Sequence, residues 1–314
     1  MNRPTESYLK VHYELRPAKQ VERRMLVDAL QILSLSDFQI RDYQYTGMGS
    51  IYFIDFILFH RALGVSKMLS VEYSTNVAKR VEFNRPFKCV NLQIAPIGDV
   101  IPTLSGSLKH ILWLDYDAPL SATHLQDVSL AGTYLTTGSI LLVTVDAEPP
   151  TESDEPADWR NYFSEQAGEY FDAKLKNGDF AQSKLPARSV ELIERALQGG
   201  MVGRTNIDFI PLFNFVYQDG HKMLTMGGMI GTQEDRDRIA KSALSRCTYY
   251  RDDLKLEPCV ITVPRLTRKE RQYLDQFMPC EDRWIPDDFE LKHDDVLAYR
   301  DIYRYCPAYA ELFF

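Results

Sequence analysis

The sequence predicts an α/β fold in which a mostly parallel sheet closes with an antiparallel hairpin. Short apolar runs typical of buried strands alternate with helical stretches from residue 38 onward. One run, 140–145, is apolar throughout, as strands covered on both faces are. Further along, the runs 208–217 and 222–231 flank Asp219-Gly220, which is a strong hairpin signal.

The first predicted element is a basic amphipathic helix within residues 1–35. Pro17 suits a first-turn position, and apolar residues then recur at helical spacing. The cations of this helix are Arg16, Lys19, Arg23 and Arg24. We expect them on the solvated face, where charge runs on helices usually lie. The alternative is that Arg16 or Lys19 reaches an anionic group near the site that follows.

Five strands and their connecting helices come next. The predicted strands are 38–45, 68–73, 89–94, 110–115 and 140–145, and the predicted helices are 51–63, 74–83 and 123–134. Glycines separate the first strand from the first helix, and Gly64 suits the C-terminal end of that helix. Apolar strands joined by helices imply a sheet covered on both faces.

Two further regions complete the organisation. The acidic, proline-containing stretch 148–158 is predicted to be a loop, and 159–200 to be helical with a break near Asn177-Gly178. In the tail, Thr267 and Glu270 form a capping box that predicts a short helix. The predicted division is a helical segment 1–35, a sheet domain 36–244 with an insertion at 148–206, and a C-terminal extension 245–314.

Composition excludes several classes of protein. Lysine and arginine number 36 against 44 aspartates and glutamates, so the formal charge of −8 argues against generic nucleic-acid binding. No apolar run approaches the ~20 residues of a membrane span, and residues 1–24 contain no apolar core of a secretion leader. The 5 cysteines are widely spaced with no CxxC, which fits reduced thiols and a cytoplasmic location.

Four loops at predicted strand ends carry candidate ligand-binding residues. The first, 45–50, holds Tyr45, Gly47, Met48, Gly49 and Ser50, and its glycines allow a close backbone approach. Glu72 follows the second strand, 23 residues after Gly49, where a carboxylate can accept ribose hydroxyls. Gly98-Asp99 and Asp115-Tyr116-Asp117 follow the third and fourth strands. Ligands of open parallel sheets bind at this edge.

At these residues the sequence resembles the class I S-adenosylmethionine-dependent methyltransferases. The resemblance covers residues 36–232 and includes the closing hairpin; bacterial chains described as putative O-methyltransferases are similar. It implies a Rossmann-like methyltransferase sheet, S-adenosylmethionine as cofactor and methyl transfer to an unidentified acceptor. Two departures are that Tyr45 stands where many members have an acidic residue, and that the Asn/Asp-Pro-Pro-aromatic motif of amino-methylating DNA enzymes is missing.

The resemblance also implies residue roles. Gly47, Met48 and Gly49 would flank the methionine part of the cofactor, within the loop that includes Tyr45 and Ser50. Glu72 would bind the ribose. Ile97, Gly98 and Asp99 would line the adenine. Asp115 and Tyr116 would face the methyl group and the acceptor, and Asp115 or Asp117 would serve as general base or act electrostatically.

Alternatives remain at this stage. No metal is predicted, although Asp117, Asp146 and Glu148 offer hard oxygen ligands, and His124 is a second candidate base. A protein that keeps the fold without catalysis, acting as a binding or scaffold subunit, is the alternative function. The alternating blocks of charge along the chain would also suit docking to a protein partner, or self-association, through the C-terminal extension.

Overall fold

The computed structural model describes residues 16–307. Residues 1–15 of the predicted helical segment and 308–314 of the predicted C-terminal extension lie outside the described residues. Most of the stretch 1–24, in which no secretion leader is predicted, lies outside them as well. The division into three segments stays a prediction. Among residues 16–307, no helix has the length and apolar character needed to cross a membrane.

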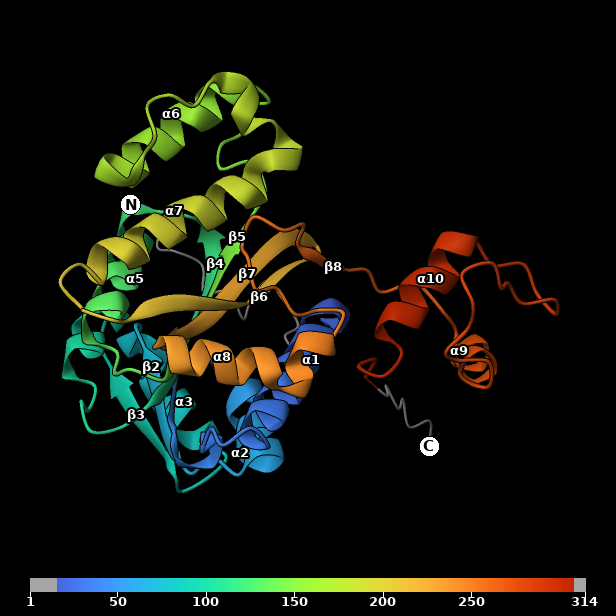
Figure 1. Cartoon of the computed structure of the whole chain (residues 1–314), viewed down its shortest axis with the longest axis horizontal. Coiled ribbons are helices and arrows are strands. Elements are labelled where there is room, and N and C mark those ends of the chain that lie inside the picture. The colour runs from blue at the N-terminus through green and yellow to red at the C-terminus, as the bar shows by residue number, and fades with distance from the viewer. Residues whose placement is uncertain (1–15, 308–314) are drawn as a thin grey trace.

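An eight-stranded sheet forms the centre of the described chain (Figure 1). Its strands are β1 Gln44–Met48, β2 Lys67–Glu72, β3 Val90–Ile94, β4 His110–Pro119, β5 Ser139–Asp146, β6 Asp208–Asp219, β7 His221–Gly231 and β8 Cys259–Ile261. They lie in the order β3-β2-β1-β4-β5-β7-β6-β8. Strands β1 to β5 pair in parallel, and β7 is antiparallel to both of its neighbours. The predicted fold class, a mostly parallel sheet with a terminal antiparallel hairpin, is therefore confirmed.

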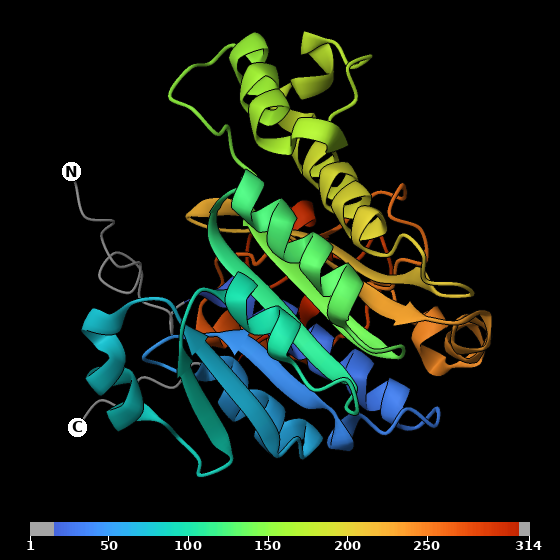
Figure 2. The same cartoon turned by 90° about the vertical axis from the view of Figure 1, so that its left-hand side faces the viewer.

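Helices cover both faces of this sheet (Figures 1 and 2). The helices are α1 Pro17–Ser34, α2 Ile54–Leu63, α3 Ala78–Asn84, α4 Ile97–Val100, α5 Ala122–Tyr134, α6 Pro156–Ala167, α7 Leu185–Gly200, α8 Gln233–Lys241, α9 Arg268–Asp275 and α10 His293–Ile302. One buried apolar cluster holds α1, α2, α3 and α8 against the sheet, and a second holds α4 to α7 against the other face. The carboxyl ends of the parallel strands stay open between them.

Helix α1 begins at Pro17, as predicted, and its N-terminus is capped from far along the chain. The backbone amides of Ala18 and Lys19 donate to the two carboxylate oxygens of Asp219, at 2.9 and 2.8 Å. Asp219 ends β6 at the tip of the predicted hairpin, where Gly220 adopts a φ of 108°. The hairpin therefore fixes the first turn of α1 over the open edge of the sheet.

Two predictions about local structure are wrong. The first strand was expected at 38–45, but Ile40–Asp42 forms a 3-10 turn and β1 starts at Gln44. Phe38 and Tyr43 are buried in the apolar core although neither belongs to a strand. The alternation of aromatic residues in this stretch therefore reflects how a loop packs against the core. Lys19 and Arg23 were expected in solvent, but they are 0% and 2% exposed. Of the four cations, Arg24 is the exposed one.

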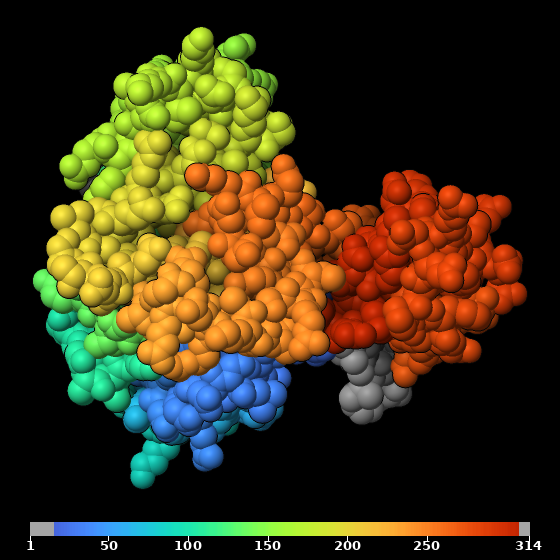
Figure 3. Space-filling model, in the orientation of Figure 1, coloured from blue at the N-terminus to red at the C-terminus, as the bar shows by residue number. Residues whose placement is uncertain are grey.

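The region after β7 extends the sheet and then leaves it. Strand β8 pairs in parallel with β6 at the edge of the sheet. Beyond it, α9 and α10 form a lobe beside the main body (Figure 3). The lobe is fastened to α1, because the Tyr305 hydroxyl donates to Asp28 at 3.0 Å and Arg24 donates to the Cys306 carbonyl at 3.1 Å. The Thr267 capping box is present at the start of α9, as predicted.

Candidate functional site

A pocket of about 210 Å³ opens at the carboxyl edge of the sheet, between the loops after β1 and β4. Met48, Gly49 and Ser50 line one side, and Asp115 with Tyr116 lines the other. The remaining lining residues are Arg16, Arg23, Phe53, Ile54, Asp55, Phe56, Asp117, Ala118, His124 and Met223. Helix α1 therefore forms a wall of a pocket built mainly from the sheet domain.

The glycine loop is packed tightly enough to exclude a side chain at two positions. A Cβ on Gly49 would lie 2.9 Å from both the Val71 carbonyl oxygen and Cβ of Glu72. A Cβ on Gly47 would lie 2.5 Å from the hydroxyl oxygen of Tyr45. The loop thus passes directly beside the end of β2, which leaves its outer surface open to a ligand.

Tyr45 supports this loop from below. Its ring is 1% exposed and packs edge-on against Phe56 and Phe59, with centroid distances of 4.8 and 4.7 Å. Burial raises the pKa of the Tyr45 hydroxyl well above its usual value. Tyr45 does not line the pocket. Its position is that of a packing residue beneath Gly47.

Phe53 carries backbone strain at the pocket wall. It adopts a φ of 50° at the N-cap of α2, a left-handed conformation that is uncommon for a bulky residue. Its ring is 1% exposed and packs against Phe56 at a centroid distance of 5.5 Å. Such strain costs on the order of 1–3 kcal/mol and persists where packing over-determines it. The first turn of α2, which follows Phe53, lines the pocket with Ile54, Asp55 and Phe56.

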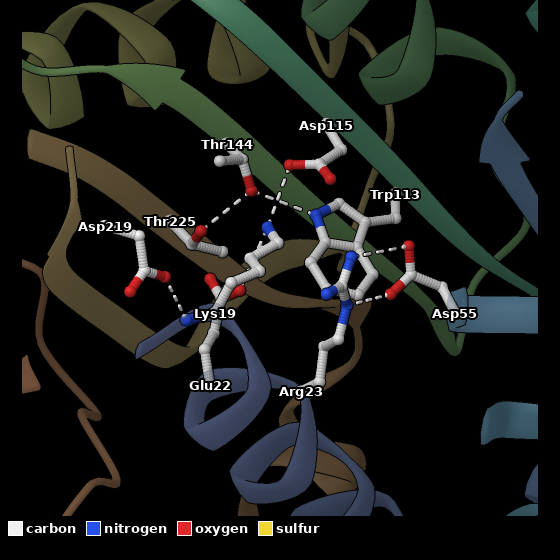
Figure 4. A network of polar contacts seen from close by, with 9 residues as sticks. All are labelled: Lys19, Glu22, Arg23, Asp55, Trp113, Asp115, Thr144, Asp219 and Thr225. Atoms are coloured by element: carbon white, nitrogen blue, oxygen red, sulfur yellow. Dashed lines mark hydrogen bonds and ion pairs between the residues drawn. The ribbon is translucent and has the colours of Figure 1, made fainter. Parts of the chain in front are cut away.

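Asp115 is held as a carboxylate by Lys19 (Figure 4). The Lys19 ammonium lies 2.9 Å from Oδ1 of Asp115 and 4.4 Å from the ring centroid of Trp113. Burial alone would raise the pKa of Asp115, but the Lys19 charge and hydrogen bond bring it below its usual value. The Asp115 side chain remains 25% exposed toward the pocket. The alternative prediction for α1, that Lys19 reaches an anionic group near the site, is confirmed.

A second carboxylate shares the same ammonium. Oε2 of Glu22 lies 2.9 Å from Nζ of Lys19, and the Glu22 side chain is 0% exposed. Burial raises the pKa of Glu22 and the Lys19 charge lowers it, with burial the larger effect. Burial likewise opposes the charge of Lys19, but its two carboxylate neighbours raise the Lys19 pKa. Lys19 therefore stays protonated and is shared between two carboxyl groups.

Arg23 forms a separate ion pair at the pocket wall. Its Nε donates to Oδ1 of Asp55, and its Nη2 lies 3.5 Å from Oδ2 (Figure 4). The Asp55 side chain is 18% exposed and belongs to the first turn of α2. This pair joins α1 to α2 across the pocket.

Tyr116 presents its ring, and not its hydroxyl, to the pocket. The hydroxyl donates to Oδ2 of Asp127 on α5 at 2.7 Å. The ring stacks on His124 with a centroid distance of 3.8 Å and an interplanar angle of 17°. Burial lowers the pKa of His124 to about 4, so its imidazole is neutral at physiological pH. Tyr116 is thus an aromatic wall whose polar atom is already bound.

The candidate nucleoside residues lie beside this pocket and not in its lining. Glu72 accepts the Ser74 amide at 2.9 Å with one carboxylate oxygen, and its other oxygen lies beside Gly49. In α4, Ile97 is buried, whereas Asp99 is exposed. A Cβ on Gly98 would lie 2.5 Å from Oδ1 of Asp127. Asp127 therefore lies against both helix α4 and Tyr116.

Sequence reasoning pointed to two of the loops that line the pocket, and it missed part of the pocket wall. The loops after β1 and β4 meet in one pocket, as expected, and Asp117 lies exposed within its lining. Asp127, Asp55 and Glu22 were not foreseen. Glu22 did carry a signal: together with Lys19 it continues the spacing of Leu26 and Leu30 along one stripe of α1. Within residues 16–307, no cluster of three or more His, Cys, Asp or Glu side chains is arranged to hold a metal ion.

Several solved structures are similar to the described fold. An O-methyltransferase from Bacillus cereus in complex with SAH shares 13% identity, covering 72% of this chain and 92% of that chain with a TM-score of 0.38. A protein described as a putative O-methyltransferase from Klebsiella pneumoniae shares 13% identity, covering 67% of this chain and 88% of that chain with a TM-score of 0.36. Trm1 from Pyrococcus horikoshii with S-adenosyl-L-methionine shares 12% identity, covering 70% of this chain and 57% of that chain with a TM-score of 0.44. These similarities are distant, and none supports a residue-level comparison. No curated protein matches the chain.

A family model gives the decisive comparison. The model described as "Putative O-methyltransferase" matches residues 11–314, which is nearly the whole chain. The predicted function, methyl transfer from S-adenosylmethionine to an unidentified acceptor, is confirmed at this level, and so is the predicted cofactor. The chain belongs to this O-methyltransferase family.

Proposed function

We propose that the protein methylates a hydroxyl oxygen of an acceptor that enters the pocket between the β1 and β4 loops. The observation that carries this proposal is the position of Asp115, a carboxylate held ionised by Lys19 and facing the glycine loop across the pocket. A fixed negative charge at that position suits a cationic reacting centre. The side of the Gly49 loop that lines the pocket, away from Val71 and Glu72, would take the methionine part of the cofactor.

The cofactor residues are proposed from the same geometry. Met48, Gly49 and Ser50 would contact the methionine part, Glu72 the ribose, and the Ile97–Val100 helix with Gly98 and Asp99 the adenine. Gly47 and Tyr45 would act beneath the loop, because Tyr45 is buried under Gly47. When bound, S-adenosylmethionine supplies an activated methyl group on a sulfonium.

The chain's own contribution is positioning, charge and removal of one proton. The Tyr116 ring and Phe53 exclude water from the pocket and orient the acceptor. Asp115 stabilises positive charge and is not the base, because Lys19 already binds its Oδ1. Asp117, exposed in the pocket lining beside the neutral His124, receives the acceptor proton.

A thermal-shift and calorimetry screen tests this function. Purified protein would be titrated with S-adenosylmethionine, S-adenosylhomocysteine, NAD and ATP. At 100 times its dissociation constant, a ligand specific to the folded state stabilises by ~2.7 kcal/mol. We expect this from the first two ligands and its loss in Glu72→Ala, whereas Glu165→Ala, an exposed site on α6, should behave as wild type. No response to either ligand would favour the non-catalytic scaffold.

The location and partners are proposed on separate grounds. Within the described residues all five cysteines are free, which supports work in a reducing cytoplasm. The C-terminal extension presents exposed apolar side chains at Val260, Phe277 and Ile285. These support a protein partner or self-association through the extension.

A further inference from the structure

The C-terminal lobe presents four aromatic rings in a row, which the proposed methyl transfer does not use. The ring of Tyr273 on α9 lies 5.0 Å from that of Phe277 and meets Phe289 edge-on at 5.5 Å, measured between centroids. Phe277 also stacks on Trp284, at a centroid distance of 5.0 Å and an interplanar angle of 25°. None of the four side chains is buried, and Phe277 is 44% exposed. We call these four residues the aromatic row.

The aromatic row belongs to the face of α9 that is not used for packing within the lobe. On the packed face, Leu274 is buried and Asp275 accepts from the Tyr299 hydroxyl of α10 at 2.7 Å. On the open face, Lys269 precedes Tyr273 by one helical turn, because residues four apart are neighbours on a helix. Lys269 is exposed. The open face of α9 therefore starts with a positive charge and continues into the aromatic row.

Segments of opposite charge flank the aromatic row. The segment 264–271, which leads into α9, contains four lysines and arginines and one glutamate. The segment 281–295, which supplies Trp284 and Phe289 to the row, contains seven aspartates and glutamates against two lysines and arginines. The surface around the row is therefore basic on one side and acidic on the other.

Four of these charged side chains are open to solvent and have no partner of opposite charge. Arg268 and Lys269 are exposed in the first turn of α9, and Glu281 and Asp287 are exposed in the acidic segment. None of the four forms an ion pair with another of the described residues 16–307. Their charges are available to a partner that carries the opposite charges.

The arrangement is complementary to itself. When two copies meet about a two-fold axis, the basic side of each lies opposite the acidic side of the other, and the two aromatic rows pack together. The lobe stands out from the main body, which leaves room for the lobe of a second copy (Figure 3). A nucleic acid is a poorer occupant, because the acidic side and the formal charge of −8 repel phosphates.

We propose that the aromatic row is the centre of an interface between two copies of this chain. Arg268 and Lys269 of each copy lie opposite Glu281 and Asp287 of the other. The inference rests on the proposed association through the C-terminal extension, which it assigns to a second copy, and does not depend on methyl transfer. Burial of the rings supplies most of the attraction, whereas the exposed charges set the partner and its orientation.

Charge reversal on each side of the row tests this interface by analytical ultracentrifugation of the full chain. The acid-to-base variant combines Glu281→Lys with Asp287→Lys, and the base-to-acid variant combines Arg268→Glu with Lys269→Glu. All four positions are exposed, so the substitutions should leave the fold intact. Glutamate in the first turn of α9 also suits the positive end of the helix dipole.

A matched control reverses two charges far from the lobe in sequence. Glu165→Lys combined with Glu169→Lys changes the net charge as much as the acid-to-base variant does, at two exposed positions of the insertion. We expect wild type and this control to form dimers of similar affinity. Both dimers should weaken as salt rises, because surface charges are screened.

Each charge-reversed variant alone should dimerise at least about tenfold more weakly, because every reversal acts at both ends of a two-fold interface. A mixture of the two variants should form a heterodimer, since each contact then joins opposite charges again. A chain with all four substitutions should dimerise with itself for the same reason.

Three results would each overturn the proposal: a wild type that stays monomeric, reversed variants that dimerise as wild type does, or a mixture that stays monomeric. The first would leave the row to a different protein. Calorimetry with S-adenosylhomocysteine on the same samples reports on the proposed methyl transfer separately. Its affinity should be equal in all variants, so a failure of ligand binding in wild type is distinguishable from a failure to dimerise.

Discussion

The Tyr116 hydroxyl donates to Oδ2 of Asp127 at 2.7 Å, while Oδ1 of Asp127 occupies the place of a side chain on Gly98. One buried carboxyl group thereby connects the wall of the pocket with the loop proposed to hold the adenine. A substitution at Tyr116 should therefore affect helix α4, and a substitution at Gly98 should affect the pocket wall.

Tyr116→Phe tests the first half of the connection. It removes the hydroxyl that Asp127 accepts from and leaves a buried carboxyl group without that donor. We expect the free energy of unfolding to fall by ~1–3 kcal/mol, measured by urea denaturation. Tyr134→Phe, at an exposed position on the same helix as Asp127, should change it little. Equal effects of the two substitutions would show that the Asp127 contact contributes nothing.

Gly98→Ala tests the second half. The added methyl group would lie 2.5 Å from Oδ1 of Asp127, so either α4 or Asp127 must shift. We expect weaker binding of S-adenosylhomocysteine by calorimetry, together with a loss of stability. Gly106→Ala is the control, because a Cβ there has no neighbour within 4 Å. Unchanged affinity in Gly98→Ala would argue against the adenine assignment of this loop.

Lys19→Met should be strongly destabilising. Methionine fills a similar volume, but it leaves Asp115 and Glu22 without their common cation. Breaking a buried ion pair from one side costs ~3–5 kcal/mol. Chemical denaturation would measure the loss, and Lys79→Met, at an exposed position on α3, should fall within ~0.5 kcal/mol of wild type. A loss below ~1 kcal/mol would mean that the ammonium is dispensable to the fold.

Glu22→Gln should change how stability depends on pH. Because burial raises the pKa of Glu22 above its usual 4.5, the folded chain binds this proton more tightly than the unfolded chain. The contribution is complete below pH 4.5 and is lost as pH rises through the folded-state pKa. Relative to wild type, the variant should therefore gain stability as pH rises from 4.5. Parallel stability curves for the two proteins would contradict this assignment.

The order of strands and helices could be predicted from the sequence because buried strands and helices leave local periodic patterns. The predicted hairpin at Asp219-Gly220 and the helix end at Gly64 follow from backbone conformations that glycine favours. The strand predicted at 38–45 failed because buried aromatic residues in a loop alternate as a strand does. Strand β8 was missed because three residues give no usable period.

The candidate site shows the same division between local and long-range information. The glycine loop and the acidic loop after β4 could be recognised from spacing along the chain. The direction of the Tyr116 hydroxyl could not, because Asp127 lies on the following helix and nothing in the sequence states which side it faces. The burial of Lys19 depends on Asp115, 96 residues away, so a local reading of α1 assigns its charge to solvent.

The cap that Asp219 places on α1 has a consequence for synthesis of the chain. On the ribosome, α1 is made first, yet its capping carboxylate appears 200 residues later. Until then, α1 cannot dock against strands β6 and β7, and the charged side chains of Lys19, Glu22 and Arg23 remain hydrated. Cofactor binding should therefore be acquired late and abruptly by ribosome-bound chains of increasing length, once the hairpin has emerged. Truncated chains that end before residue 219 should contain strands β1 to β5 but no completed pocket.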